Sequence, residues 1–242
     1  MITGVMAIHN EMLLLPYALN CLKDAPLDEL VVVLDRCTDR SEEIIRMFKP
    51  KYPLKIYYKT WRNWQNPVAE VFEYGFSLAK GDILYGLSAD CTYDKKTFDK
   101  KPFKNYALVS YRCDQRDLHT SFFRQNYEIF LRIIFQKLVA EVWRGFFATK
   151  KEVWQQLHFR DTKSEYGEHT QFVDYRNRLL EAGYKHFHDE STRNTHLRGA
   201  ITKERQLREG KGRRTQGYPL WRVLLHSILH LKPYVLVGYL NA

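Results

Sequence analysis

The stretch Gly81-Asp-Ile-Leu-Tyr-Gly-Leu-Ser-Ala-Asp90-Cys-Thr-Tyr-Asp94 decides how the rest of this chain is read. Its apolar run, Ile83 to Leu87, is short and bounded by polar residues, which is typical of a central strand in a parallel sheet. Asp90 follows just past the carboxyl end of that strand, where open α/β sheets bind their ligands. A carboxylate there can hold a divalent cation, and the cation can hold a diphosphate. The alternative is that Asp90 only caps a turn.

The residues before this stretch alternate between short apolar runs and helical patterns. The runs predict strands at Ile2 to Ile8, Glu29 to Leu34 and Leu54 to Tyr58. A helix is expected after each strand, with Asn10 capping the first and Pro67 opening the third. Such an alternation implies an α/β fold, with a mostly parallel, Rossmann-like sheet joined by right-handed crossovers and flanked by helices.

After Asp94 the alternation loosens, and the elements are expected to be shorter. Strands are expected at Ala107 to Tyr111, 145–149 and 184–188, with helices over part of 118–143, over 151–157 and from 167 to Ala182. Gly183 is a good residue to end the last of these helices. Residues 189–198, which include His196, are predicted to form a loop.

The charge of the chain is unevenly distributed. The formal net charge is +10, and from Arg193 to the end there are ten Lys/Arg against two Asp/Glu. Such an excess favours an anionic partner, namely a nucleotide, a nucleic acid or an acidic membrane surface. We expect no nucleic acid partner, because the basic residues cluster in the sequence after the acidic residues of the predicted strand ends, and do not alternate with aromatic residues on one sheet face.

The four cysteines and the start of the chain indicate a reducing compartment. The cysteines form no C-x-x-C pair, which argues against a structural zinc site and a disulfide scaffold. The first residues lack the basic start and long apolar core of a signal peptide. A cytoplasmic location is therefore expected.

The end of the chain is predicted to be an appendage to a domain that spans residues 1–199. Residues 200–217 are rich in Lys, Arg and Gly, and are expected to be an exposed basic linker. Residues 218–242 are apolar, with Arg222, His226 and His230 at a spacing that places them on one polar stripe of a helix. Because this segment is too short and too interrupted to span a bilayer, we expect an amphipathic helical tail that lies on a membrane surface. The alternative is that the tail packs back on the domain.

Polar side chains follow several predicted strands at the point where each ends. They are His9, Asn10 and Glu11 after the first strand, Asp35 and Asp39 after the second, and Asp90 after the fourth. One such carboxylate is often only a helix cap, but the ends of parallel strands converge on a single crevice. Neither a P-loop nor a G-x-G-x-x-G sequence is present. A nucleotide that binds in this crevice would therefore be held without a glycine-rich phosphate loop.

At this point the sequence resembles family 2 glycosyltransferases of the GT-A fold. Ala7-Ile-His-Asn-Glu11 is similar to their "P-A-x-N-E", and Val32-Val-Leu-Asp-Arg-Cys-Thr-Asp-Arg-Ser41 is similar to "V-V-D-D-G-S-T-D-G-T". Asn66-Pro-Val-Ala-Glu70 through Ala79-Lys-Gly-Asp82 resembles their "A-x-N … A-x-G-D" helix. Leu87-Ser-Ala-Asp90 lies where they carry the "L-D-A-D" metal motif.

The resemblance continues toward residue 198. Gly167-Glu-His-Thr-Gln-Phe172 and Arg178-Leu-Leu-Glu-Ala-Gly-Tyr184 look like "G-E-D-T-E-L … R-L-x-x-A-G-Y". His196 with Arg198 is similar to the late "H-x-R". Singly these motifs are weak, but their order and spacing over residues 2–198 are specific.

The resemblance implies an inverting glycosyltransferase that uses a nucleotide sugar linked to UDP or GDP. The implied donor-binding residues are Ala7, His9, Asn10, Glu11, Asp35, Asp39, Ser88, Ala89 and Asp90. Asp90 would hold Mg²⁺ or Mn²⁺ on the donor diphosphate, with His196 as a second ligand. Glu168 would be the general base that accepts the proton of the acceptor hydroxyl. With the tail, this implies a glycan or lipid-linked acceptor at the inner face of the cell membrane.

Three departures from the family pattern leave alternatives open. Ser88 replaces the first aspartate of the metal motif, and His169 replaces the aspartate next to Glu168. The interval to Gly183 is about one helical turn longer, so Glu165 or Asp174 could also be the base. The chain could then be a catalytically inactive protein that binds nucleotide sugars or serves as a scaffold. His186 and His188 could suggest another metal site, but are expected to be ordinary edge-strand residues.

Overall fold

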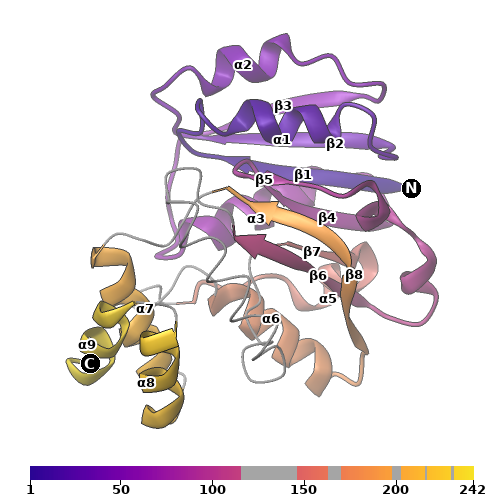
Figure 1. Ribbon diagram of the computed structural model, residues 1–242. Coiled ribbons are helices and arrows are strands. Elements are labelled where there is room, and N and C mark those ends of the chain that lie inside the picture. The colour runs from indigo at the N-terminus through magenta and orange to yellow at the C-terminus, as the bar shows by residue number, and fades with distance from the viewer. Residues whose placement is uncertain (116–145, 163–169, 198–202, 216, 230–231) are drawn as a thin grey trace. The chain divides into compact units, whose positions relative to one another are not determined.

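The structure, a computed structural model, describes residues 1–115, 146–162, 170–197, 203–215, 217–229 and 232–242 (Figure 1). The chain divides into two compact units. The described residues 1–115, 146–162 and 171–197 form the α/β unit, and those from 203 to 242 belong to the helical unit. Each unit is described by itself below.

An eight-stranded mixed sheet organises the α/β unit, in the order β3-β2-β1-β4-β7-β6-β8-β5. β1 pairs in parallel with β2 and β4, and β2 pairs in parallel with β3. β7 is antiparallel to both β4 and β6, whereas β6 and β8 are parallel. The predicted fold class, α/β with a mostly parallel sheet of GT-A type, is confirmed.

The strands and helices of this unit lie close to their predicted positions over the first ninety residues. The strands are β1 Ile2–Ile8, β2 Glu29–Asp35, β3 Leu54–Lys59, β4 Ile83–Ser88, β5 Cys91–Thr92, β6 Leu108–Gln115, β7 Phe147–Lys150 and β8 His186–His196. The helices are α1 Leu15–Leu22, α2 Ser41–Met47, α3 Pro67–Leu78, α5 Lys151–Leu157 and α6 Thr170–Glu181, with short 3₁₀ turns η1 Lys95–Phe98 and η2 Lys101–Lys104.

Apolar residues cover both faces of the sheet, as expected of buried parallel strands. One core cluster joins β1, β2 and β4 to α1 and α2 through residues such as Leu19, Leu22 and Ile45. The other joins the opposite face to α3, α5 and α6 through residues such as Phe76 and Tyr175. This three-layer packing fixes the strand ends at one edge, where the predicted site residues lie.

Local sequence signals explain how α3 and α6 are bounded. Pro67 opens α3, and the side chain of Asn66 accepts a hydrogen bond from the Ala69 N–H. Gly183, with φ of 83°, follows the end of α6, a conformation that glycine adopts without steric cost. The predicted cap of the first helix is wrong: α1 begins at Leu15, and Asn10 instead bonds to the turn after β2.

The prediction of a loop over residues 189–198 is also wrong, because β8 continues to His196. Its first part pairs with β6, and its last residues pair with β6 and β5 together. β8 has no apolar periodicity that would have predicted it. Backbone pairing and the buried polar side chains of Thr192 and Asn194 stabilise this strand instead. His196 therefore lies on a strand.

The described part of the helical unit contains α7 Lys203–Thr215, α8 Leu220–Leu229 and α9 Pro233–Leu240. The prediction of an exposed basic linker over 200–217 is wrong for 203–215, which are helical. α7 packs closely on α9 because two glycines meet there. A Cβ on Gly210 would lie 2.0 Å from the Val235 carbonyl oxygen, and one on Gly238 would lie 2.1 Å from that of Leu207. Only glycine permits so close an approach of two backbones.

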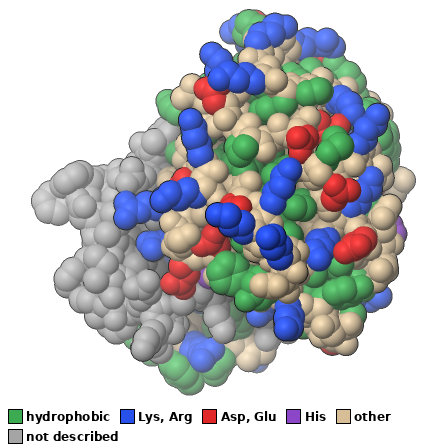
Figure 2. All heavy atoms as spheres, turned by 90° about the vertical axis from the view of Figure 1, so that its right-hand side faces the viewer, with side chains coloured by type: hydrophobic (Ala, Val, Ile, Leu, Met, Phe, Trp, Pro, Cys, Tyr) green, Lys and Arg blue, Asp and Glu red, His purple; other side chains and the backbone are tan. Residues whose placement is uncertain are grey.

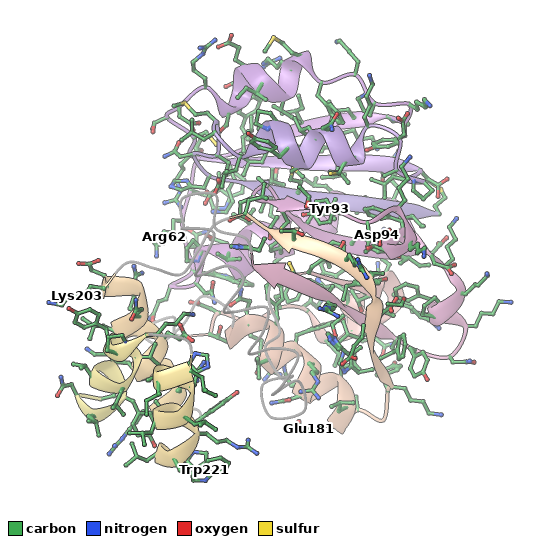
Figure 3. The ribbon with its side chains drawn as sticks, in the orientation of Figure 1. Arg62, Tyr93, Asp94, Glu181, Lys203 and Trp221 are labelled. Atoms are coloured by element: carbon green, nitrogen blue, oxygen red, sulfur yellow. The ribbon has the colours of Figure 1, made fainter. Side chains whose placement is uncertain are left out.

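The polar stripe predicted for the tail is split, because Arg222 is exposed whereas His226 is buried. His226 is only 9% exposed, and its Nε2 lies 3.0 Å from Arg213 Nη2 and 3.4 Å from Glu209 Oε1. His230 lies outside the described residues. The exposed residues of α8 are instead mostly apolar. Trp221, at the beginning of the helix, is 55% exposed and Ile228 is 61% exposed (Figure 3).

Two features of the molecule bear on the expected partners. Within the described residues, no helix has the length and apolar character needed to cross a membrane. On the face of the molecule shown in Figure 2, Lys and Arg side chains lie among acidic and apolar ones and do not form one continuous basic area.

Candidate functional site

The carboxyl ends of β1, β2 and β4 lie next to one another at one edge of the sheet. Ala7 of β1 is the register partner of Val33 in β2 and of Ser88 in β4. Ala89 and Asp90 follow β4 directly, and Asp35 is the last residue of β2. The predicted donor-binding residues thus lie along a single edge, with Asp35 and Asp90 at the ends of two strands that flank β1.

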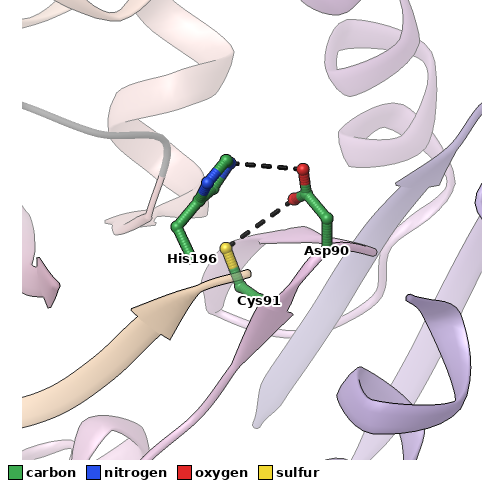
Figure 4. Close-up of side chains that lie close together, drawn as sticks. All are labelled: Asp90, Cys91 and His196. Carbon is green, nitrogen blue, oxygen red and sulfur yellow. Dashed lines mark hydrogen bonds and ion pairs between the residues drawn. The ribbon is translucent and has the colours of Figure 1, made fainter. Parts of the chain in front are cut away.

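Asp90 and His196 are in direct contact at this edge. His196 Nε2 lies 3.2 Å from Asp90 Oδ2, and both side chains are only slightly exposed (Figure 4). The contact follows from the backbone, because β5 pairs with the end of β8 and the Leu197 N–H donates to the Asp90 carbonyl oxygen. The two residues predicted to share a metal ion are therefore neighbours.

The Cys91 thiol lies close to the other oxygen of the same carboxylate. Its Sγ is 3.8 Å from Asp90 Oδ1. A hydrogen bond with the Cys113 thiol, together with burial, raises the pKa of Cys91 well above its ordinary value. One ligand atom each from Asp90, Cys91 and His196 fall within 4.8 Å of one another, the one such metal-ligand group in the described part of the chain.

These donors fit a divalent cation. Carboxylate oxygen and imidazole nitrogen are common metal ligands, and two ligands about 2.1 Å from an ion lie roughly 3 to 3.5 Å apart. The 3.2 Å between His196 Nε2 and Asp90 Oδ2 matches that separation. Asp90 and His196 can therefore hold one cation together without a large movement of either side chain.

Asn194 fixes the position of His196, and sequence analysis missed it. Its Oδ1 accepts hydrogen bonds from the Asp94 N–H at 3.0 Å and the Thr97 hydroxyl at 2.9 Å. Its Nδ2 donates to the Arg112 carbonyl oxygen at 3.1 Å and to the Thr192 hydroxyl at 3.2 Å. The one available signal is its spacing, since residues two apart on a strand share a face.

Asp94 also contributes to this arrangement. It follows β5 and Tyr93, close to β8 (Figure 3). Its Oδ2 accepts from the Arg193 N–H at 3.2 Å, and its Oδ1 accepts from the Lys96 N–H at 3.0 Å. The turn after the metal-binding edge is therefore tied to the strand that carries His196.

Asp35 lies in a buried group of charges that sequence analysis did not foresee. Both of its oxygens accept from Arg36 at 2.9 Å, and Lys59 Nζ lies 3.6 Å from Oδ1. Lys59 is fully buried and also bonds to Glu70 at 2.8 Å and to the Trp61 carbonyl oxygen. The Asp35 carboxylate is therefore held in place before any ligand binds.

The turn after β1 is held against the turn after β2. His9 Nδ1–H donates to the Asp35 carbonyl oxygen at 2.6 Å, because a carbonyl oxygen can only accept. Asn10 Oδ1 accepts from the Thr38 N–H at 2.7 Å. Asn10 and Arg36 both have positive φ, 54° and 50°, an uncommon conformation for residues other than glycine.

Asp39 and Glu11 join the same pair of turns. Asp39 accepts from the N–H groups of Met12 and Ser41, each at 2.9 Å, and the Glu11 N–H donates to the Ser41 hydroxyl at 2.8 Å. Burial raises the pKa of Asp39, but its hydrogen bonds outweigh burial and lower it overall. The contacts seen for Asn10 and Asp39 hold the loop together, and their role in donor binding stays a prediction.

The predicted general base lies outside the described residues. Glu168 and the alternative Glu165 both fall within 163–169. The third candidate is Asp174, whose Oδ2 lies 2.9 Å from Arg178 Nε and 2.8 Å from Arg178 Nη2. The guanidinium of Arg178 also donates to the carbonyl oxygens of Leu157 and His158. Asp174 therefore has a structural partner at the junction of α5 and α6.

His186 and His188 share the hydroxyl of Ser110. His186 Nε2 lies 2.9 Å and His188 Nδ1 lies 2.8 Å from Ser110 Oγ, and Arg176 Nε donates to His186 Nδ1 at 3.3 Å. Burial lowers the pKa of His186 to about 4 and lowers that of His188. A cation would be disfavoured beside Arg176, so these rings form a neutral polar chain between β6 and β8.

Comparison with solved structures supports the fold. The chain is similar to a mannosyltransferase from Pyrobaculum calidifontis in complex with GDP-Man and Mn²⁺, with 17% identity and a TM-score of 0.63, covering 98% of this chain and 72% of that one. It is also similar to glucosyl-3-phosphoglycerate synthase from Mycobacterium tuberculosis in complex with Mn²⁺, UDP-Glc and phosphoglyceric acid, with 16% identity, a TM-score of 0.58, and 91% and 79% coverage.

A third similar structure is S. aureus TarS, with 13% identity and a TM-score of 0.56, where the match covers 86% of this chain and 39% of that one. At such identities the likeness establishes the fold alone. The comparison with curated proteins found no match. The sequence model of glycosyl transferase family 2 matches residues 4–163, which is most of the chain. With the sheet topology and the strand-edge site above, this match shows that the chain belongs to glycosyl transferase family 2.

Proposed function

We propose that this protein is an inverting, metal-dependent glycosyltransferase that moves a sugar from a nucleoside diphosphate donor to a glycan or lipid-linked acceptor. The observation that carries the proposal is the contact of Asp90 with His196 at the carboxyl edge of the sheet. Family membership and the nucleotide sugars bound to two structural neighbours, GDP-Man and UDP-Glc, support a donor of this class.

The nucleoside part of the donor would bind at the ends of β1 and β2. The Asp35 carboxylate accepts from Arg36 through both oxygens, but a carboxylate offers about four acceptor positions. It can therefore still accept a hydrogen bond from a ribose hydroxyl or a base N–H. The exposed ring of His9 offers Nε2 as a further hydrogen-bonding atom in the same place.

The diphosphate would bind at the Ser88-Ala89-Asp90 turn. Asp90 and His196 would hold Mg²⁺ or Mn²⁺, which when bound offsets the negative charge of the leaving nucleoside diphosphate. The residues of the chain orient this group, because β5 and β8 fix both ligands through the backbone. Ser88 would contribute a neutral hydroxyl in place of a carboxylate.

Inversion requires a base on the acceptor side of the anomeric carbon. We assign this role to Glu168, which would accept the proton of the acceptor hydroxyl while that oxygen attacks. Glu165 stays an alternative. Asp174 is a weaker candidate, because Arg178 holds its carboxylate at 2.8 Å.

A donor-binding and turnover experiment tests this proposal. A panel of UDP- and GDP-sugars with Mn²⁺ is screened by calorimetry, and hydrolysis or transfer is then measured for the donor that binds. We expect Asp90→Ala to abolish metal-dependent donor binding, and Glu168→Gln to lower turnover by about 10²-fold or more while donor binding persists. Asp174→Asn is the matched control.

Two outcomes would overturn this assignment in different ways. Donor binding without turnover in the wild-type protein would show the catalytically inactive alternative. Unchanged turnover in Asp90→Ala would refute the metal role of Asp90.

The helical unit would place the enzyme on the cytoplasmic face of the cell membrane. Leu220, Leu224 and Ile228 recur every four residues on α8 and are all exposed, with Trp221 beside them. α9 adds exposed Tyr234, Val237 and Leu240. Apolar residues flanked by basic ones, such as Arg222, are typical of helices that lie in the interface of an anionic bilayer.

Flotation with liposomes tests this part of the proposal. We expect the wild-type protein to float with vesicles that contain anionic lipid. The double variant Trp221→Ser/Ile228→Ser should reduce the bound fraction about tenfold or more, because each substitution removes about 1 to 3 kcal/mol of favourable free energy from burial of an apolar side chain in the membrane. Leu180→Ser, which removes an exposed apolar residue of the α/β unit, should have no effect. A wild-type protein that never floats would refute the membrane contact and the acceptor class that depends on it.

A further inference from the structure

The side chains around Asp90 include a sulfur donor that the proposed function does not use. Cys91 is 2% exposed, and its Sγ lies 3.8 Å from Asp90 Oδ1, whereas His196 Nε2 lies 3.2 Å from Asp90 Oδ2. The carboxylate thus contacts a thiol through one oxygen and an imidazole through the other, and the three groups form a triangle (Figure 4).

The three ligand atoms have the spread of a metal site. They lie within 4.8 Å of one another. In a tetrahedral site with metal–oxygen and metal–nitrogen bonds of about 2.1 Å and a metal–sulfur bond of about 2.3 Å, ligand atoms are roughly 3.4 to 3.7 Å apart. The separations of 3.2 Å between His196 Nε2 and Asp90 Oδ2 and of 3.8 Å between Cys91 Sγ and Asp90 Oδ1 bracket that range, so small side-chain rotations would suffice.

The backbone holds the thiol in this place. Cys91 and His196 are register partners in the antiparallel pair of β5 and β8, so their side chains leave the sheet on the same face. Asn194 anchors β8 two residues before His196. Because Cys91 is the most buried of the three, it would bind from the protein side and leave the outer positions of the ion to the diphosphate.

We propose that Cys91 is a third protein ligand of the cation held by Asp90 and His196, and that the site therefore prefers thiophilic divalent cations such as Zn²⁺ or Co²⁺ over Mg²⁺. A set of one carboxylate, one imidazole and one thiolate suits these ions, whereas Mg²⁺ takes oxygen ligands. On binding, the thiol gives up its proton to solvent and the sulfur–metal bond forms. The inference rests on the proposed function, because it concerns the same cation.

Cobalt spectroscopy of the full-length protein tests this assignment without an activity assay. Titration with Co²⁺ alone should produce visible d–d bands and a near-ultraviolet sulfur-to-cobalt charge-transfer band. We expect Cys91→Ser to lose the charge-transfer band and to bind Co²⁺ about tenfold more weakly or worse, with Mg²⁺ binding unchanged. Cys113→Ser and Cys37→Ser are the matched controls and should keep the band.

The outcomes separate this inference from the proposed function. Visible bands without a sulfur band, or a sulfur band that persists in Cys91→Ser, would overturn the role of Cys91 and leave glycosyl transfer untouched. Failure of the wild-type protein to bind Co²⁺ would overturn both this inference and the metal role of Asp90. A sulfur band in a protein that binds no nucleotide sugar would support the ligand and refute the transferase.

Discussion

The described parts of the two units differ in how many apolar residues they bury and in where their charged residues lie. The α/β unit packs two large apolar clusters against the faces of its sheet, and its charged site residues lie at the strand ends. In the described part of the helical unit, a small apolar cluster lies around Val223, Val235 and Tyr239, while α8 exposes Trp221 and Ile228. Its interior instead contains Glu209 with Arg213, His226 and Lys232 around it.

In the described part of the helical unit, Val223 is the one α8 residue in this buried cluster, and the exposed Trp221 and Ile228 lie outside it. Among the described residues of this unit, the ion pairs of Glu209 and the close contact of α7 with α9 also hold the helices together. The α/β unit buries charges too, around Lys59, but surrounds them with an extensive core. The predictions below test whether the units differ in this way.

The largest effect is expected in the α/β unit, from Lys59→Met. Removal of the buried ammonium leaves Glu70 with only the N–H groups of the Trp61–Trp64 loop and Asp35 with Arg36, which should cost about 3 to 5 kcal/mol of unfolding free energy. Urea denaturation measures this loss. Lys51→Met, which removes an exposed partner of Asp24, should cost less than about 0.5 kcal/mol.

The corresponding change in the helical unit is Lys232→Met. Its Nζ lies 3.7 Å from Glu209, and Arg213 keeps the carboxylate paired at 2.8 Å. The loss should therefore be smaller than for Lys59→Met. Equal losses at the two sites would contradict the contrast between the buried charges of the two units.

A pair of glycine substitutions should have the next largest effect. In Gly210→Ala the new methyl would meet backbone, the Val235 carbonyl oxygen, at 2.0 Å, which should cost about 2 to 3 kcal/mol and reduce helical circular dichroism. In Gly75→Ala it would meet a side-chain methyl of Val5 at 2.4 Å. Because a side chain can move, we expect a smaller loss in thermal stability. The reverse order would show that α7 and α9 are not tightly packed.

The smallest expected effect is a dependence of stability on pH through His226. Burial lowers its pKa to about 4, and the nearby charges of Arg213 and Lys232 act in the same direction, whereas Glu209 opposes them. Between the unfolded pKa of about 6.5 and the folded value, only the unfolded chain binds the proton. Stability is therefore lost as pH falls through this window, by about 2 kcal/mol at about pH 5.

Urea denaturation of wild type and His226→Asn at about pH 7 and about pH 5 measures the contribution of this ring. The variant should lose part of the pH dependence, and the remainder should include His186, whose pKa burial also lowers to about 4 in the α/β unit. Glu209 should contribute little there, because the stability that its lowered pKa provides is lost mainly as pH falls below the unfolded carboxyl value of about 4.5. Identical pH dependence in wild type and variant would show that His226 is not buried in solution.

The sequence predicted the first half of the sheet well because local patterns determine it. β1 to β4 are short apolar runs, and Pro67 and Gly183 bound their helices through backbone preferences that need no tertiary context. The contact of Asp90 with His196 was also foreseen, although only by resemblance to a family. The second part of β8 was not predicted, because Thr192 and Asn194 are buried by pairing with distant strands.

The buried charges and the helical unit could not be predicted for a related reason. Lys59 ends β3 like any solvated lysine, and only the packing of α3 places Glu70 beside it. α7 carries glycines that weaken an isolated helix, yet Gly210 is what allows α9 to approach. In α8 the apolar spacing predicted the helix, but His226 of the predicted polar stripe is buried, because it finds its partners on α7.

The four hydrogen bonds of Asn194 have a consequence for reading related sequences. Its amide uses every donor and acceptor position it has, and so connects the strand of His196 to both its neighbours. In a relative that retains the histidine but lacks the asparagine, the strand that carries the metal-ligating histidine would lack these hydrogen bonds. Inspecting these two positions together would help to separate catalytically active members of the family from inactive ones.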